Sequence, residues 1–323
     1  MMKSKHKGWA TAIAVGCALA FATQATADEL KPIEIPGDQA YPESMSAASD
    51  GTIYISSVGS GGVARVKPGA SKAEMWIKPG AFDTRNTFGV LVDEKTNTLW
   101  VCSNDISGMG IPGPSSVPGA HLKGFDLATG EGKFSAAFPG NAHVCNDMVI
   151  APDGTTYVTN TAAPQILRLK PGAKDLEIWF ENDLLAPKNG AGLDGIALGD
   201  DGNLYVNTYG GNEFIRITLK DGVPGAVTKL ETSRPIKYPD ALRQLTGNTF
   251  LMAEGGGTVD RVTVNGDKVD IESLKDGLNG PTSVAKVGNT IWVGEGQLGH
   301  LFAAKQSGPP TLPFQAVPIS LGN

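Results

Sequence analysis

Residues 146–160 have the sequence NDMVIAPDGTTYVTN, and close variants of this stretch recur along the chain. Each variant consists of a short apolar strand, a turn rich in Gly, Asp or Asn, and a second strand, which is the pattern of a β-hairpin. The full-length variants are ESMSAASDGTIYISS at 43–57 and DGIALGDDGNLYVNT at 194–208. Two further variants, DALRQLTGNTFLMAE at 240–254 and TSVAKVGNTIWVGE at 282–295, have a hairpin that is one residue shorter. The hairpin is therefore the repeating unit of the fold.

The spacing of the repeat indicates the architecture. A bulky residue of the second strand recurs at intervals of 46, 57, 48, 45 and 42 residues, at Tyr54, Trp100, Tyr157, Tyr205, Phe250 and Trp292. Periods of roughly 40 to 50 residues with short strands and frequent turns are typical of β-propeller blades. With 42 Gly, 21 Pro and no long segment of helical period, we expect few helices. The sequence predicts an all-β fold, a six-bladed β-propeller with four-stranded blades around a central channel. A β-sandwich, the main rival, does not need six similar repeats.

Strand positions and ring closure follow from the same pattern. In the third blade, strands are expected at residues 147–150, 156–159, 165–169 and 176–180. Two segments compete to complete the sixth blade and close the ring, residues 32–36 and residues 314–319.

The first 27 residues have the features of a cleaved secretory signal peptide. Three lysines precede an apolar run at 9–21, and Ala25-Thr26-Ala27 supplies a cleavage site of small residues. Ala14-Val15-Gly16-Cys17 is a weaker match to a lipoprotein box. The apolar run is too short for a comfortable membrane span. We expect residues 28–323 to form one domain, periplasmic or secreted, and a monomer or weak oligomer.

Net charge limits the classes of partner that we expect, and the two cysteines of the mature chain indicate a disulfide. Removing residues 1–27, which hold three lysines and no acid, moves the net charge from −6 to −9. An acidic surface argues against nucleic acid and anionic membranes as partners and leaves a small molecule. Cys102 and Cys145 remain, at the end of one blade's second strand and the start of the next blade's first strand. We expect them to form a disulfide, with two free thiols as the alternative.

Four repeats begin with a side chain that offers an oxygen: Glu43, Asn146, Asp194 and Asp240. First-strand starts meet at one face of a propeller, so these residues should converge at the channel mouth. Clustered carboxylates repel unless they are protonated or bind a cation, and oxygen ligands favour hard metals. We expect one divalent cation, with Ca²⁺ as the first choice and Mg²⁺, Mn²⁺ or Zn²⁺ as alternatives. Zinc is disfavoured because His121, His143 and His300 lack ligand spacing. The alternative is that each residue only caps a turn.

Second-strand ends add polar side chains to the same face. Asn104, Asn160 and Asn207 are expected to form a rim that binds a hydroxylated or carbonyl-bearing ligand. The longest interval between repeats contains its extra residues at 105–122. We expect this segment to be a loop that overhangs the same face. The GMGIPG sequence at 108–113 is not a nucleotide signature, because a proline interrupts it and no helix follows.

The blade pattern resembles the gluconolactonase/regucalcin (senescence-marker-protein) family of six-bladed propellers over essentially the whole mature chain. The resemblance is carried by Tyr41-Pro42-Glu43, Cys145-Asn146-Asp147, Leu193-Asp194-Gly195 and Tyr238-Pro239-Asp240, in that blade order. It implies that Glu43, Asp194 and Asp240 hold the metal and that Asn146 contacts the substrate or the metal. It also implies that Asp240 is the catalytic base.

Two positions depart from that family. Asp194 replaces the usual Asn, which keeps an oxygen ligand and adds a negative charge. Val144 stands where sugar-lactonase members often have Arg, which weakens the case for an aldonolactone. The resemblance implies an exported, divalent-metal-dependent hydrolase that opens a lactone or related ester. The alternatives are a non-catalytic periplasmic propeller that binds a ligand or protein at this face, and a propeller with other chemistry such as the strictosidine-synthase-like enzymes.

Overall fold

The computed structural model describes residues 1–323 except 4, 6–7, 9–29, 304–306 and 322–323. Residues Met1–Leu30 and Lys31–Asn323 are separate units, and the second is the folded domain. The predicted signal peptide lies almost wholly outside the described residues, so it stays a prediction. Among the residues that the structure describes, no helix has the length and apolarity needed to cross a membrane.

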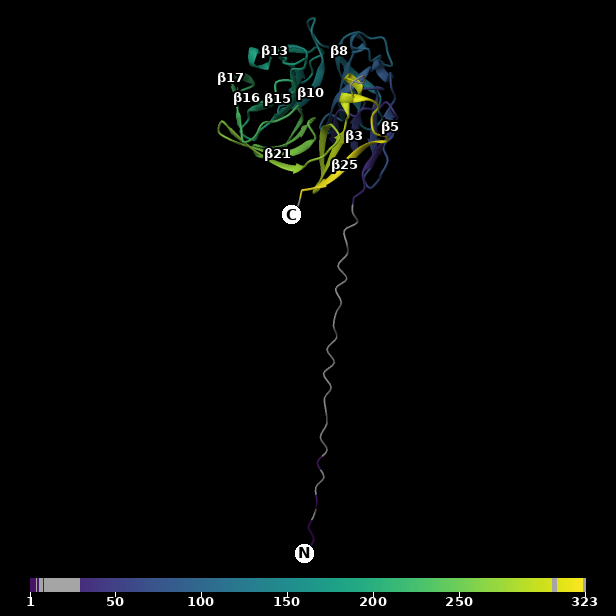
Figure 1. Cartoon of the computed structure of the whole chain (residues 1–323), viewed down its shortest axis with the longest axis vertical. Helices are drawn as coiled ribbons and strands as arrows, with labels where there is room; N and C mark the ends of the chain where they lie inside the picture. The colour runs from purple at the N-terminus through teal and green to yellow at the C-terminus, as the bar shows by residue number, and fades with distance from the viewer. Residues whose placement is uncertain (4, 6–7, 9–29, 304–306, 322–323) are drawn as a thin grey trace. The chain divides into compact units, whose positions relative to one another are not determined.

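The folded unit contains six antiparallel sheets, which confirms the six-bladed propeller (Figure 1). The first strands of successive blades contact one another in a closed cycle around the axis. Blades one to three, each from its inner to its outer strand, consist of β2 (Met45–Ala47), β3 (Ile53–Ser56), β4 (Val63–Val66) and β5 (Glu74–Ile77); β6 (Asn86–Asp93), β7 (Thr98–Asn104), β8 (Ala120–Asp126) and β9 (Gly132–Ala137); and β10 (Cys145–Ile150), β11 (Thr156–Asn160), β12 (Gln165–Leu169) and β13 (Glu177–Glu181).

Blades four to six follow the same plan with two additions. They consist of β14 (Leu193–Leu198), β15 (Leu204–Thr208), β16 (Glu213–Lys220) and β17 (Val223–Lys229); β19 (Pro239–Thr246), β20 (Thr249–Glu254), β21 (Thr258–Asn265) and β22 (Lys268–Lys275); and β23 (Pro281–Val287), β24 (Thr290–Glu295), β25 (Phe314–Ser320) and β1 (Ile33–Ile35). The short strand β18 (Glu231–Thr232) pairs in parallel with β22 and gives the fifth blade a fifth strand.

Ring closure uses both of the segments that the sequence placed in competition. β25 is the third strand of the sixth blade, and β1 pairs with it as the outermost strand. The expectation that only one of the two segments would be used was therefore wrong. The sixth repeat supplies only β23 and β24, so both β25 and β1 are needed to complete four strands. An N-terminal strand in the last blade joins the two ends of the domain, so the ring cannot open without breaking a β-ladder.

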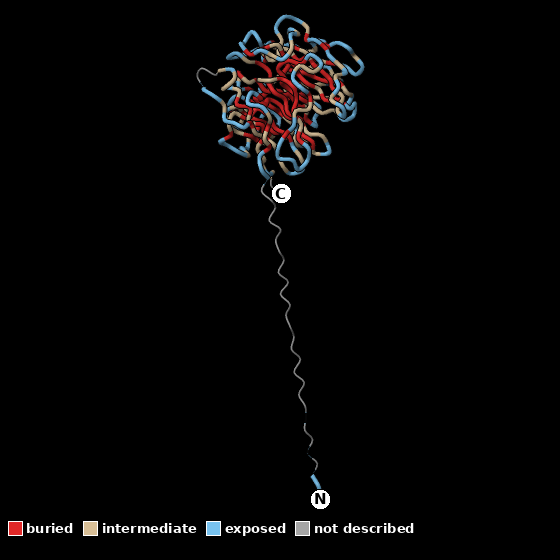
Figure 2. Tube along the Cα trace, turned by 90° about the vertical axis from the view of Figure 1, so that its right-hand side faces the viewer, coloured by how far each residue is buried: buried red, intermediate tan, exposed pale blue. Residues whose placement is uncertain are grey.

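The strands expected in the third blade agree with the structure to within two residues at each end, and helices are scarce as predicted. The described part of the chain holds one α-helix, α1 (Leu298–Phe302), and three 3₁₀ turns, η1 (Ala81–Asp83), η2 (Ser107–Met109) and η3 (Asp183–Leu185). The core is made of buried residues between the blades, and Figure 2 colours the backbone trace of these residues red.

One register is shared by all six inner hairpins. An apolar residue of the inner strand faces an apolar residue of the second strand, as in Met45 opposite Ile55 and Leu242 opposite Met252; the other pairs are Val90–Val101, Met148–Val158, Ile196–Val206 and Val284–Val293. The residue two positions before the inner-strand residue of each pair is also equivalent in all six blades. These residues are Glu43, Phe88, Asn146, Asp194, Asp240 and Thr282. We call these six residues the mouth positions.

Candidate metal centre

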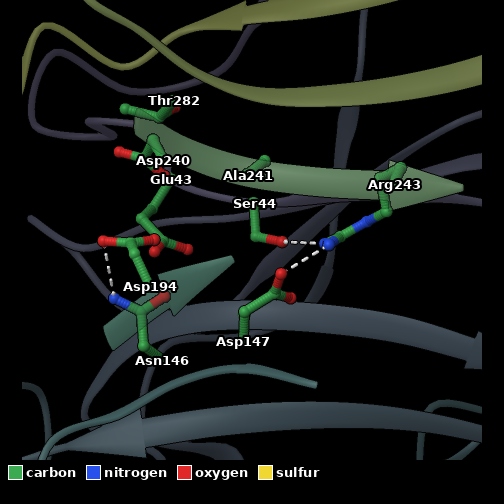
Figure 3. Close-up of a pocket in the computed structure, with 10 residues that line it drawn as sticks. Glu43, Ser44, Asn146, Asp147, Asp194, Asp240, Ala241, Arg243 and Thr282 are labelled. Atoms are coloured by element: carbon green, nitrogen blue, oxygen red, sulfur yellow. Dashed lines mark hydrogen bonds and ion pairs between the residues drawn. The ribbon is translucent and has the colours of Figure 1, made fainter. Parts of the chain in front are cut away.

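Three of the mouth positions form one compact cluster of acids. Glu43, Asp194 and Asp240 each present a carboxylate oxygen, and these oxygens lie within 4.8 Å of one another (Figure 3). The three side chains come from blades one, four and five, and their residues are only 4%, 6% and 4% exposed. The convergence expected from strand direction is therefore present in the geometry, and the binding of a metal stays a prediction.

β-Bulges aim two of these side chains, Asp194 and Asp240, into the channel. The ladder between the first two strands shifts register at Leu193/Ile196 and at Pro239/Leu242, and Asp194 and Asp240 lie inside those bulges. An extra residue in a strand bends it locally and turns a side chain out of the normal alternation. Gly195 follows Asp194, and a Cβ there would collide with the backbone carbonyl of Asp240. Glycine at this place lets neighbouring inner strands approach closely enough to bring the carboxylates together.

Side chains of the preceding blade hold the backbone of each ligand strand. Thr159 Oγ1 donates to the carbonyl of Asp194 at 2.8 Å, and Asn207 Nδ2 donates to the carbonyl of Asp240 at 2.7 Å. Thr282, the mouth position of the sixth blade, donates to the carbonyl of Pro42 at 2.9 Å, directly before Glu43. Because each bond crosses a blade boundary, the position of every carboxylate depends on the neighbouring blade.

Asn146 lies beside the acids. Its Nδ2 donates to Asp194 Oδ2 at 3.3 Å, and the residue is 5% exposed (Figure 3). It is therefore placed where the resemblance expects a residue that contacts the metal or the substrate.

The three asparagines expected to form a substrate-binding rim are engaged with backbone. Asn104 donates to and accepts from the peptide groups of Cys145, at 2.8 and 2.9 Å. Asn160 accepts from Val144 N and donates to Ala142 O, each at 3.0 Å. Asn207 accepts from Gly195 N at 2.8 Å in addition to its bond to Asp240. All three residues are at most 1% exposed, so their geometry favours a structural role and substrate contact by them stays a prediction.

Burial raises the pKa values of the three acids, so without a neighbouring positive charge the cluster keeps protons bound. Loss of solvent, followed by repulsion from Asp147, raises the pKa of Asp194 to about 8. Burial, and then the charge of Asp194, raises the pKa of Glu43 and of Asp240 well above their ordinary values. Two ionised oxygens 4.8 Å apart repel by roughly 3 kcal/mol at an effective dielectric constant of 20. The fully ionised cluster therefore needs a counter-charge.

An ion pair that the sequence analysis missed lies farther along the channel. Arg243 on β19 meets the buried carboxylate Asp147 Oδ2 at 2.5 Å and also donates to Ser44 Oγ at 3.3 Å (Figure 3). Through Asp147 and Ser44, Arg243 therefore links blade five to blades three and one. In the sequence, Asp147 stands out only as the residue after Asn146, and no pattern marks Arg243, 96 residues away, as its partner.

The residues present fit a divalent cation. All three carboxylates are hard oxygen donors from separate inner strands, and Glu43 Oε2 is buried without a hydrogen-bond partner. Buried polar atoms are nearly always satisfied, so an orphaned carboxylate oxygen indicates that an ion or water completes the site. Among the described residues, the three-acid cluster is the candidate metal group, and neither His121 nor His143 is part of it.

The predicted disulfide is present. Cys102 on β7 and Cys145 on β10 are bonded, with a Cα–Cα separation of 5.2 Å, and both are fully buried. The bond joins blades two and three directly before Asn146.

Comparison with known proteins shows the fold. No protein-family model matches the chain, and no curated protein sequence is significantly similar to it. A gluconolactonase from Xanthomonas campestris superimposes with a TM-score of 0.63 at 15% identity, over 90% of this chain and 96% of its own. The major Malassezia sympodialis allergen Mala s 1 has a TM-score of 0.67 at 13% identity, over 90% and 95% of the two chains. The PQQ-bound aldose sugar dehydrogenase from Streptomyces coelicolor has a TM-score of 0.60 at 13% identity, over 90% and 96%.

Proteins with such different names share one architecture, so at these identities the likeness establishes the fold and leaves the activity open. Gluconolactonases are among the structural neighbours, as the resemblance in the sequence implied. The chain therefore has a gluconolactonase-like propeller fold.

Proposed function

We propose that the protein is a divalent-cation-dependent hydrolase that opens a lactone or related ester at Glu43, Asp194 and Asp240. One observation carries this proposal: three buried carboxylates from separate blades converge within 4.8 Å at the channel, and one of their oxygens has no partner. The gluconolactonase among the structural neighbours supports a lactone as the substrate class.

The chain's own residues supply binding and proton transfer. A cation held by the three carboxylates would polarise the substrate carbonyl and stabilise negative charge on its oxygen. Asp240 accepts a proton from water as the water oxygen bonds to the carbonyl carbon. The ring C–O bond then breaks and the leaving oxygen takes up a proton, so lactone and water give one hydroxy acid. Asn146 orients the group bound beside Asp194.

We also propose that the protein acts outside the cytoplasm. The buried Cys102–Cys145 bond supports this, because structural disulfides persist in oxidising compartments.

The test is a panel of lactones with protein stripped by a chelator and reloaded with Ca²⁺, Mg²⁺, Mn²⁺ or Zn²⁺. We expect turnover that depends on the added cation and falls by about 100-fold or more in Asp240→Asn, the usual size of a general-base contribution. Asp175→Asn is the matched control, because Asp175 is exposed on a turn of the third blade. Absence of hydrolysis with every lactone and every cation contradicts the proposal and leaves the binding propeller.

A further inference from the structure

Groups that could recognise sugar hydroxyls are scarce around the acid cluster. Asn104 and Asn207 use both ends of their amides on backbone, and the hydroxyl of Thr282 is bonded to Pro42 O. A site that discriminates a polyol must offer free donors and acceptors to its hydroxyl groups. Among the buried side-chain oxygens beside the cluster, Glu43 Oε2 and Asp147 Oδ1 are without a protein partner, and both are carboxylate acceptors.

The channel mouth has one apolar position, in blade two. Phe88 takes the mouth position of the second blade, where other blades present oxygen atoms, and it is 6% exposed. It belongs to a buried apolar cluster with Val58, which follows β3, and with Ile106 and Ile111 of the loop after β7. Leu298 and Leu301 of α1 pack against the same cluster. This side offers contact to apolar groups.

Two tyrosines stand on the other side, between blades four and five. Tyr209 follows β15, and its backbone N–H donates to Gly192 O at 2.9 Å, two residues before Asp194. Tyr238 lies two residues before Asp240. The two rings are stacked, with centroids 5.3 Å apart and an interplanar angle of 29°. The pair therefore borders the two acids contributed by these blades.

The tyrosine pair is open to a ligand. Tyr238 is 41% exposed and Tyr209 is partly exposed, and neither hydroxyl has a hydrogen-bond partner among the described residues. Tyr238 has a positive φ of 55° directly before a proline, a strained conformation that surrounding structure must enforce. At the equivalent place in the sixth blade, Gly280 adopts φ 56° before Pro281. Tyr41, at the equivalent place in the first blade, has φ 42° before Pro42, so the conformation belongs to this position of the fold and glycine adopts it without strain.

We propose that this site takes a lactone or ester whose body is aromatic or apolar, held on the Tyr209–Tyr238 pair, and that it selects against polyhydroxylated sugar lactones. The inference rests on the proposed function and names its substrate class. A flat or apolar body gains by stacking on the exposed rings, whereas a polyol gains less apolar contact there and must exchange the water around several hydroxyl groups for the few free polar atoms of the site. Tyr209 and Tyr238 are then the specificity-determining residues.

The experiment measures binding separately from hydrolysis by using lactams, which mimic lactones and resist hydrolysis. Calorimetry with Ca²⁺-loaded protein compares 3,4-dihydroquinolin-2-one, the lactam of dihydrocoumarin, with gluconolactam. We expect only the aromatic lactam to bind, and about tenfold more weakly in Tyr209→Ala and in Tyr238→Gly. Tyr209→Phe, which keeps the ring, is the matched control and should bind within about twofold of the wild type.

Each outcome decides one question. Tighter binding of gluconolactam, no binding of the aromatic lactam, or unchanged binding in both ring-deleting variants overturns the inference. Tyr238→Gly keeps the test valid if Tyr209→Ala fails to fold, because glycine suits the backbone at that position. If the aromatic lactam binds as expected but no lactone of the panel, dihydrocoumarin included, is hydrolysed with any cation, the proposed hydrolysis fails while the inference stands. If gluconolactone is hydrolysed and gluconolactam binds more tightly, hydrolysis stands and the inference fails.

Discussion

Raising the pH from 5 to 7 should destabilise the cation-free protein. The pKa of Asp194 is about 8 in the folded state, against an ordinary value of 3.8, chiefly because of burial and then because of Asp147. Between these two values the folded state binds a proton that the unfolded state releases. The free energy of unfolding therefore falls as pH rises through this window, the reverse of the behaviour of a carboxylate in a favourable ion pair.

The expected size follows from proton linkage. One displaced proton costs about 1.4 kcal/mol per pH unit, so Asp194 alone should remove about 3 kcal/mol of stability between pH 5 and 7. Glu254, whose pKa burial raises to about 7, acts in the same direction. His121, whose pKa is lowered chiefly by burial, acts in the opposite direction. Glu43 and Asp240, whose pKa values are raised well above their ordinary values by burial and then by the charge of Asp194, also act in the same direction. A variant at Asp194 is needed to separate the contribution of the acid cluster from those of Glu254 and His121.

The assay is urea unfolding followed by tryptophan fluorescence, with a chelator present, at pH 5 and pH 7. Asp194→Asn keeps the shape of the side chain and cannot exchange the proton, while Glu254 and His121 are unchanged. We expect the loss of stability on raising the pH to be about 3 kcal/mol smaller in the variant. Equal pH dependence in the two proteins would refute the assignment of a buried, protonated acid cluster. Addition of Ca²⁺ at pH 7 should restore about 3 kcal/mol at 100 times its Kd.

Three further predictions concern other contacts. Replacing Cys102 and Cys145 by Ser should lower the free energy of unfolding by about 4 kcal/mol, from the entropy of a 43-residue loop, and urea unfolding of the reduced and oxidised wild type should reproduce the difference. Asn207→Leu leaves two buried peptide groups unpaired and should cost about 2 to 6 kcal/mol in urea unfolding, together with a weaker calorimetric affinity for Ca²⁺; unchanged affinity would mean that this bond does not position Asp240. Arg243→Met leaves Asp147 buried and unpaired and should cost about 3 to 5 kcal/mol at pH 7, with most of the loss recovered in Arg243→Met/Asp147→Asn; absence of recovery would refute the pairing.

The repeat carried enough information to predict the fold and to bring three acids together. A hairpin with a fixed distance between its first residue and the bulky residue of its second strand keeps the same register in every blade. Residues at the start of that register, such as Glu43 and Asp240, must then meet at one face. The disulfide followed for the same reason, because Cys102 and Cys145 lie at adjoining strand ends of neighbouring blades.

Contacts that depend on the spacing between blades could not be predicted from the sequence. An amide at a strand end can face solvent or the next blade, and Asn207 faces the next blade because the inner strands approach closely at Gly195. The Arg243–Asp147 pair depends on where each bulge shifts the strand, which a hairpin pattern does not encode. Stacking of Tyr209 on Tyr238 likewise depends on a backbone conformation that is rare before proline.

The central claim is that Glu43, Asp194 and Asp240 together hold one divalent cation. Native mass spectrometry of the purified protein titrated with Ca²⁺ measures the stoichiometry directly. We expect one bound ion per chain in the wild type and in the surface control Asp175→Asn, and loss of that ion in Asp194→Asn/Asp240→Asn. Absence of a bound ion from the wild type, or its retention in the double variant, would contradict the account.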